Sequence, residues 1–372
     1  MTSKANEGFV RVDLDEIDAN QEEKVRFSKV QGRLIKDARQ AAQPPICLIC
    51  GKPLEKPCNS HTVPQYCLRE IAVDGKVLSL AALLDINILS SEVGVKQAGI
   101  FKSVCRTCDT EFFKKYETPD NLFEEPEDDV LGQIAAKNLL RGIYKGRQDV
   151  QFSRTLSPLY PYFYRLGQVR AIDVHEDEKN LEKAVASARG TGKTRNYTVI
   201  YHEVLPYVVP IAFQGKIEPI SDFHGRLLNN VYSPDPRYKL QALHTCIFPA
   251  KGKTVVLVFR DSAAKRCREF VREFRGLSTD EKQIALLKLI FANSEEVYLS
   301  KRLPQSVFED VELRKLARMN NVYAPRDMIG DFSMQGQLER AQKDFALDNL
   351  PTPPNLLSEA YAVHPSVGKE QA

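Results

Sequence analysis

Two pairs of cysteines have the spacing of metal ligands. Cys47 and Cys50 form one C-x-x-C pair, and Cys105 and Cys108 form a second. Two residues between thiolates allow one tight turn to direct both sulfurs at a single ion, and two such turns complete a tetrahedral Zn²⁺ site. The sequence therefore predicts a structural zinc site with these four ligands. Two unrelated pairs, one of them redox-active, are the alternative interpretation.

The other four cysteines do not follow this spacing. The 54 residues between Cys50 and Cys105 exceed the roughly 12–20 of compact zinc modules, but a longer loop costs little free energy. Cys58 and Cys67 lie in this insertion and are possible substitute ligands. Cys246 and Cys267 lie far along the chain, and we expect them to be small apolar core residues.

A histidine lies between the two cysteine pairs. His61 opens the sequence His-Thr-Val-Pro, and it is one of only six histidines in the chain. An imidazole whose pKa is near the ordinary value of about 6.5 can act as a general base at neutral pH. The same side chain can also ligate a cation or serve a purely structural role. All three roles stay open for His61 at this point.

Residues 44–116 resemble the HNH, or ββα-metal, endonuclease family. The resemblance rests on the first C-x-x-C pair, a polar residue followed by His61 and x-x-Pro, and a second C-x-x-C pair that opens a helix. It implies a treble-clef module in which the four cysteines hold zinc and His61 is the general base. It also implies a catalytic Mg²⁺ or Mn²⁺ near Asn59, Ser60 and Asp109.

Two positions depart from the pattern of this family. Ser60 stands where the family has an acidic residue, and Asp109 follows the last cysteine in place of histidine or asparagine. Asp109 and the Asn59 carbonyl offer the oxygen ligands that Mg²⁺ and Mn²⁺ prefer, whereas Ser60 is a poor anionic ligand. The active site is therefore either retained in altered form or lost, which would leave a structural zinc module.

The resemblance implies metal-dependent hydrolysis of phosphodiester bonds, with DNA favoured over RNA as the substrate. Such hydrolysis needs a base near the attacking water and a cation on the phosphate. Prokaryotic defence against phage is a role suggested by analogy alone. Basic residues near the second cysteine pair are candidates for phosphate contacts: Lys102, Arg106, Lys114 and Lys115. The alternative is a non-catalytic zinc protein that binds nucleic acid or assembles a complex.

The composition is that of an ordinary globular protein. Hydrophobic residues make up 43% of the chain, charged residues 27%, and the net charge is +3, which neither requires nor excludes a nucleic-acid partner. No stretch is long and apolar enough for a membrane helix, and the N-terminus lacks a signal-like apolar segment. We therefore expect a cytoplasmic protein with reduced thiols and no membrane partner.

The hydrophobic pattern divides the chain into four segments and predicts an α+β fold. We expect an N-terminal helical segment at 1–43, the zinc-binding module with a following helix at 44–150, an α+β domain at 151–350 and a loosely ordered tail at 351–372. Residues 151–372 are the candidate region for a protein partner. The α+β domain is predicted to hold an antiparallel sheet, with strands at 197–205, 208–213, 216–220, 242–248 and 254–259.

Apolar periodicity and capping signals predict the helices. Ser278 and Glu281 form a capping box, which predicts the start of a helix. Further helices are predicted at residues 17–42, 77–89, 131–144, 180–188 and 305–319.

Overall fold

A computed structural model describes residues 32–84, 91–158, 161–191, 195–319 and 333–363. Of the helix predicted at 17–42, residues 32–42 are described and the remainder lies outside the described residues; residues 32–41 are helical and Ala42 forms a turn. Of the predicted tail, residues 351–363 are described and include the 3₁₀ helix η3 (Glu359–Tyr361).

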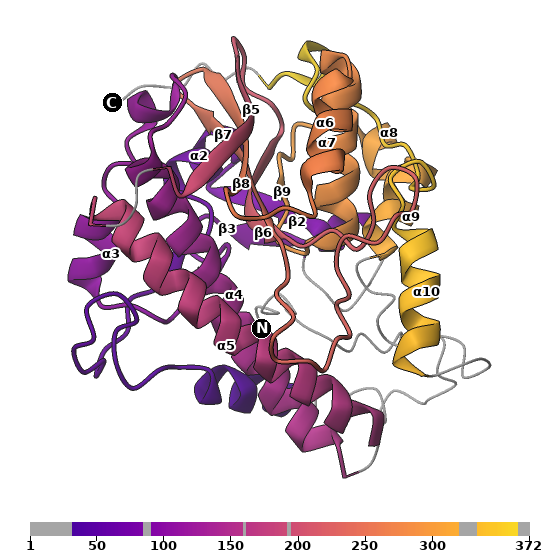
Figure 1. Ribbon diagram of the computed structural model, residues 1–372. Helices are drawn as coiled ribbons and strands as arrows, with labels where there is room; N and C mark the ends of the chain where they lie inside the picture. The colour runs from indigo at the N-terminus through magenta and orange to yellow at the C-terminus, as the bar shows by residue number, and fades with distance from the viewer. Residues whose placement is uncertain (1–31, 85–90, 159–160, 192–194, 320–332, 364–372) are drawn as a thin grey trace, which may run out of the picture.

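One antiparallel sheet of seven strands forms the centre of the described chain (Figure 1). Its spatial order is β3–β2–β9–β6–β7–β8–β5. The strands are β2 (Lys76–Ser79), β3 (Glu92–Gly94), β5 (Tyr197–Leu205), β6 (Ile211–Ile217), β7 (Leu243–Ala250), β8 (Lys253–Asp261) and β9 (Tyr298–Leu299). Together with the helices, this sheet confirms the α+β expectation.

Both faces of the sheet are buried. On β7, Leu243 and Ile247 belong to one hydrophobic core, whereas Cys246 and Phe248 belong to a second core. Successive side chains of a strand point to opposite faces, so the two cores lie on opposite sides of the sheet. This agrees with the burial of every residue of β7 and of the middle of β8.

Helices cover the two faces (Figure 1). A long helical hairpin, α4 (Asp128–Leu156) and α5 (Pro161–Ala188), packs with α2 (Gln65–Ile71) on one side. The helices on the other side are α6 (Arg268–Gly276), α7 (Thr279–Asn293), α8 (Gln305–Phe308), α9 (Val311–Met319) and α10 (Met334–Asp344).

The predicted capping box is present at the start of α7. The Ser278 hydroxyl accepts a hydrogen bond from the Glu281 backbone N–H, and the Glu281 carboxylate accepts one from the Ser278 backbone N–H. Each contact satisfies a backbone donor that the first helical turn would otherwise leave unpaired.

A second, smaller sheet lies beside the cysteine pairs. Strand β1 (Ser60–His61) pairs antiparallel with β4 (Ile100–Phe101), and α3 (Arg106–Phe112) follows β4. The long insertion between the cysteine pairs also contributes to the large sheet, because β2 pairs with both β3 and β9. The residues between the two pairs therefore form part of the central sheet.

Three local predictions are wrong. The helix predicted at 77–89 is instead strand β2 and the 3₁₀ helix η1 (Leu80–Leu83), and its last five residues lie outside the described ones. A short apolar run fits a buried strand as well as a helix, and pairing with β9 decides the outcome. The strands predicted at 208–213 and 216–220 are the single strand β6, and the helix predicted at 305–319 is divided into α8 and α9.

Candidate metal centre

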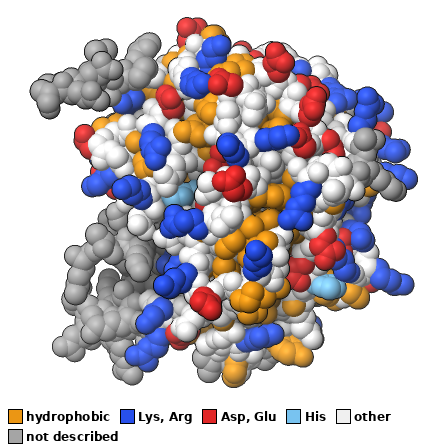
Figure 2. Space-filling model, turned by 90° about the vertical axis from the view of Figure 1, so that its left-hand side faces the viewer, with side chains coloured by type: hydrophobic (Ala, Val, Ile, Leu, Met, Phe, Trp, Pro, Cys, Tyr) orange, Lys and Arg blue, Asp and Glu red, His pale blue; other side chains and the backbone are white. Residues whose placement is uncertain are grey.

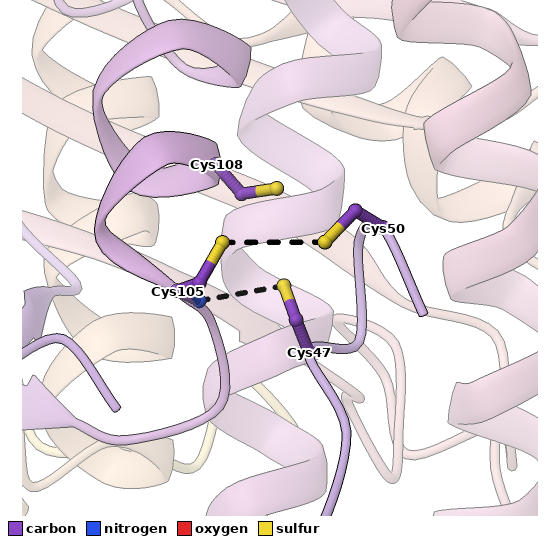
Figure 3. Close-up of side chains that lie close together, drawn as sticks. All are labelled: Cys47, Cys50, Cys105 and Cys108. Atoms are coloured by element: carbon purple, nitrogen blue, oxygen red, sulfur yellow. Dashed lines mark hydrogen bonds between the residues drawn. The ribbon is translucent and has the colours of Figure 1, made fainter. Parts of the chain in front are cut away.

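The four predicted cysteine ligands lie together (Figure 3). The Sγ atoms of Cys47, Cys50, Cys105 and Cys108 are all within 4.8 Å of one another, and those of Cys50 and Cys105 are 4.0 Å apart. Two thiolates on one tetrahedral Zn²⁺ would be separated by about 3.8 Å, given Zn–S bonds of ~2.3 Å. The four cysteines are thus close enough to hold a metal ion, and four thiolates are a ligand set of structural zinc sites.

Backbone contacts shape both cysteine turns. Gly51 has a φ of 71°, a conformation that glycine adopts without strain, and its N–H donates to the Cys47 carbonyl at 2.8 Å. The N–H of Leu48 donates to the carbonyl of Ser103 at 3.1 Å, which ties the first turn to the second. The Cys105 N–H donates to Cys47 Sγ at 3.4 Å, as backbone amides do around metal-bound sulfur.

The turns also favour the thiolate form of one ligand. A hydrogen bond from the Lys52 backbone lowers the pKa of Cys50 to about 7, whereas burial raises the pKa of Cys47. Because a metal binds the thiolate rather than the thiol, metal binding must release protons from the more buried ligand.

The remaining cysteines are separate from this cluster. Cys67, Cys246 and Cys267 are fully buried, as expected for small core residues. Cys58 lies nearer, but its Sγ donates to Asp109 Oδ2 at 3.5 Å instead of joining the four thiols. The described structure therefore does not use Cys58 or Cys67 as a substitute ligand.

A fully buried lysine lies beside the cysteine cluster. Lys137 Nζ, on α4, is 3.0 Å from Asp109 Oδ1, 3.0 Å from Ser60 Oγ and 3.3 Å from Glu117 Oε1. It also lies 3.8 Å from the centre of the Phe113 ring, where a cation is attracted by the ring face. The Ser60 hydroxyl donates in turn to Asp109. Ser60 and Asp109 thus lie together, and the Lys137 ammonium contacts both of them.

The two carboxylates that contact Lys137, those of Asp109 and Glu117, have pKa values shifted in opposite directions. Burial opposes ionisation of Asp109, but the Lys137 charge and the hydrogen bonds from Ser60 and Lys137 hold its pKa below the usual range. Burial dominates at Glu117 and raises its pKa in spite of the same lysine. Asp109 is therefore the ionised partner of Lys137, and the pair is stable only while both charges are present.

His61 faces a different set of partners from those of Ser60. Neighbouring residues of a strand point to opposite faces, and the His61 ring lies 3.1 Å from Gln65 Nε2, whose Oε1 accepts from Arg69 Nη2 at 2.8 Å. Burial and the charge of Lys137 lower the pKa of His61. The imidazole is therefore neutral at neutral pH and half-buried, and it lies beside the face of α2 that carries Gln65 and Arg69.

The other predicted residues are on the surface near this region. Asn59 is exposed, as are Arg106, Lys114 and Lys115, whereas Lys102 is half-buried. Lys115 is paired with Asp129. Figure 2 shows the side of the molecule that carries α3, where lysine and arginine side chains gather along the left margin and a strip of hydrophobic side chains runs down the centre.

Comparisons with protein-family models, with curated proteins and with solved structures each find no match. Within the described residues, no helix has the length and apolar character needed to cross a membrane.

Proposed function

We propose that this chain is a nucleic-acid-binding protein built on an HNH-like, zinc-stabilised module in which an ammonium group takes the place of the catalytic cation. The observation that carries the proposal is the position of Lys137 Nζ, 3.0 Å from both Ser60 Oγ and Asp109 Oδ1. These are two of the three residues that the resemblance assigns to Mg²⁺ or Mn²⁺.

The order of the elements supports the resemblance. The first cysteine turn precedes β1, β4 pairs with β1, and the second cysteine pair opens α3. A zinc ion on the four thiolates would join the turn, the strand pair and the helix, as in a treble clef. Zinc would then be a structural cofactor, and its four protein ligands would leave no open position for catalysis.

The surroundings of Lys137 leave little room for a second metal. Ser60 is fully buried and the Lys137 ammonium already neutralises Asp109. Mg²⁺ needs near-octahedral oxygen ligands and usually keeps several waters. Among the described residues, the cysteine cluster is the only group of three or more His, Cys, Asp or Glu ligands that converges.

Nucleic acid as partner is supported by the charge near His61. Arg69 and Lys96 are exposed; Arg69 bonds to the glutamine that contacts His61, and the Lys96 backbone lies beside the imidazole. Arg106 is exposed at the start of α3. Such cations bind phosphates in a sequence-independent way, with an affinity that falls as salt rises.

A metal-dependent endonuclease is the second candidate, and one observation favours it. His61 is half-buried, neutral and oriented by Gln65, which is the state that a general base requires. In this case a second metal would have to displace Lys137 from Asp109, whose side chain retains 22% exposure.

Binding and cleavage assays on the full-length, zinc-loaded chain separate these functions. We expect binding to double-stranded DNA that weakens between 50 and 200 mM salt, with no cleavage of supercoiled plasmid in Mg²⁺ or Mn²⁺. Arg106→Glu should weaken binding, whereas Lys343→Glu, which reverses an exposed charge on α10, should not.

Two results would overturn the proposal. Cleavage that requires Mn²⁺ and is lost in His61→Ala would establish the endonuclease instead. Absence of binding to DNA and RNA at 50 mM salt would remove nucleic acid as the partner and leave a structural role for the zinc module.

A further inference from the structure

Two adjoining cavities lie between the α4–α5 hairpin and strand β6, and no member of the cysteine cluster lines either one. Their volumes are about 270 and 300 Å³, at or just below the lower end of the roughly 300–1,000 Å³ of drug-sized ligand pockets. They share five lining residues: Asp173, Asp177, Lys216, Glu218 and Leu240. The shared wall makes the two cavities a candidate site for one small, elongated ligand.

Glycines on α4 allow this site to form. A Cβ atom at Gly142 would lie 3.1 Å from Asp177 Oδ2, and one at Gly146 would lie 2.5 Å from Val174 Cγ2. The absence of side chains at both positions lets α5 approach α4 closely and brings its carboxylates next to β6. A methyl group at Gly146 would force the two helices apart.

Each cavity has a surplus of negative charge. Five carboxylates and three basic side chains line the first cavity, and the same numbers line the second. Lys216, in the shared wall, is saturated, because its Nζ contacts both oxygens of Asp177 at 2.5 and 2.7 Å and Glu218 at 2.7 Å. An anionic ligand would therefore meet net repulsion, whereas a cationic ligand would meet attraction.

Two carboxylates of the first cavity are poorly compensated. Asp149 is buried, and its Oδ2 accepts no hydrogen bond within the described structure; Arg170 Nε is 3.4 Å away. Asp173 contacts the same guanidinium, with Nη1 at 3.5 Å. The Arg170 guanidinium is thus shared between the two acids, and Lys145 and Lys216 add weaker attraction to Asp149 and Asp173 respectively. Burial raises the pKa of Asp149, and it raises that of Asp173 to about 7, even though Arg170 opposes both shifts, because burial disfavours the charged carboxylate.

We propose that the two cavities bind a linear aliphatic polyamine, with one ammonium group donating to Asp149 Oδ2 from the cavity, beside the Arg170 guanidinium, and its methylene chain along Leu240 toward the second cavity. The apolar side chains of Val169 and Leu240 suit methylene groups. A single metal ion does not fit, because no three carboxylates of the described residues converge within 4.8 Å. Charges spread along an elongated cavity match amines that are separated by methylene groups.

Isothermal titration calorimetry with spermidine tests the proposal on the full-length, zinc-loaded chain. The expected result is saturable binding of one spermidine per chain, with at least a tenfold loss of affinity in the double variant Asp149→Asn/Asp173→Asn. Glu125→Gln makes the same chemical change at an exposed carboxylate outside the cavities and should retain full affinity.

Several outcomes would overturn the proposal. The first is the absence of saturable heat when spermidine is added. The second is an unchanged affinity for spermidine in the double variant. The third is displacement of spermidine by Mg²⁺ at the same concentration of positive charge. Thermal unfolding of the ligand-free double variant and of Glu125→Gln verifies the fold, since replacing a carboxylate by its amide keeps the shape of the side chain. The assay contains no nucleic acid, so its result is independent of the function proposed above.

Discussion

The ammonium of Lys137 lies 3.0 Å from Oδ1 of Asp109, the residue that directly follows the last cysteine of the cluster. Lys137 belongs to α4 and Asp109 to α3, so this contact joins the cysteine module to the helical hairpin. The lysine side chain is fully buried and its partner is mostly buried. The pair therefore links α3 to α4 in the protein interior, which gives it a structural role whether or not it replaces a cation.

Removing the lysine charge should destabilise the protein strongly. In Lys137→Met, Asp109 would remain as a buried carboxylate without its cation, and we expect the free energy of unfolding to fall by about 2–4 kcal/mol. Lys137→Met/Asp109→Asn removes both charges and should recover part of this loss. Urea unfolding of the two variants measures the difference, and equal destabilisation in both would contradict the ion-pair account.

Loss of a cysteine ligand should remove both the metal and stability. Cys105→Ser is expected to lose bound zinc and to unfold at a lower temperature, because structural zinc contributes directly to folding. Cys58→Ser is the matched control, since Cys58 lies nearby but outside the cluster. Metal analysis and thermal unfolding should show one zinc per chain in Cys58→Ser and none in Cys105→Ser. Retention of zinc in Cys105→Ser would exclude the four-cysteine site.

Asp173 should make the folded state less stable at high pH. Burial raises its folded pKa to about 7, and among its neighbours Arg170 and Lys216 oppose this rise, whereas Glu218 and Asp177 reinforce it. The unfolded pKa is about 3.9, so the penalty is absent below pH 4 and grows as pH rises toward 7.

We therefore expect Asp173→Asn to raise the free energy of unfolding by about 1–3 kcal/mol at pH 8 and to change it little at pH 4.5. Urea unfolding at the two pH values measures this effect. Destabilisation at pH 8, or an equal gain at both pH values, would disagree with the account.

Close packing of α4 on α5 should make a small substitution costly. A Cβ at Gly132 would lie 2.6 Å from the backbone nitrogen of Ala188 and 3.0 Å from the carbonyl oxygen of Ala184. Backbone atoms cannot turn aside as a side chain can, so Gly132→Ala should cost about 1–3 kcal/mol. Gly276→Ala, where no atom lies within 4 Å, should be neutral or stabilising in the same thermal unfolding measurement.

The local signals in the sequence were sufficient for the cysteine cluster and much of the sheet. Two C-x-x-C turns carry their own geometry, and the strand predicted at residues 197–205 coincides with β5. The capping box at Ser278 is also a local feature. Each of these depends on residues that are neighbours in the chain, which is why a pattern can predict them.

The remaining features depend on distant partners. The sequence predicts a helix at residues 77–89 because nothing local indicates that β2 pairs with β9, a segment more than 200 residues away. The role of Lys137 was missed for the same reason: Ser60 and Asp109 lie in other elements. The sequence does contain one signal, because Lys137 is three residues from both Ile134 and Leu140, and residues three apart share one face of a helix. A charge in that position indicates a buried partner.

The most direct test of the central claim is the metal content of the full-length chain after equilibration with Zn²⁺ and Mn²⁺ followed by desalting. If Lys137 occupies the cation position, the chain will carry one zinc and no manganese. One zinc together with one manganese, with the manganese lost in Asp109→Asn, would show that a divalent cation displaces Lys137 and would contradict the account.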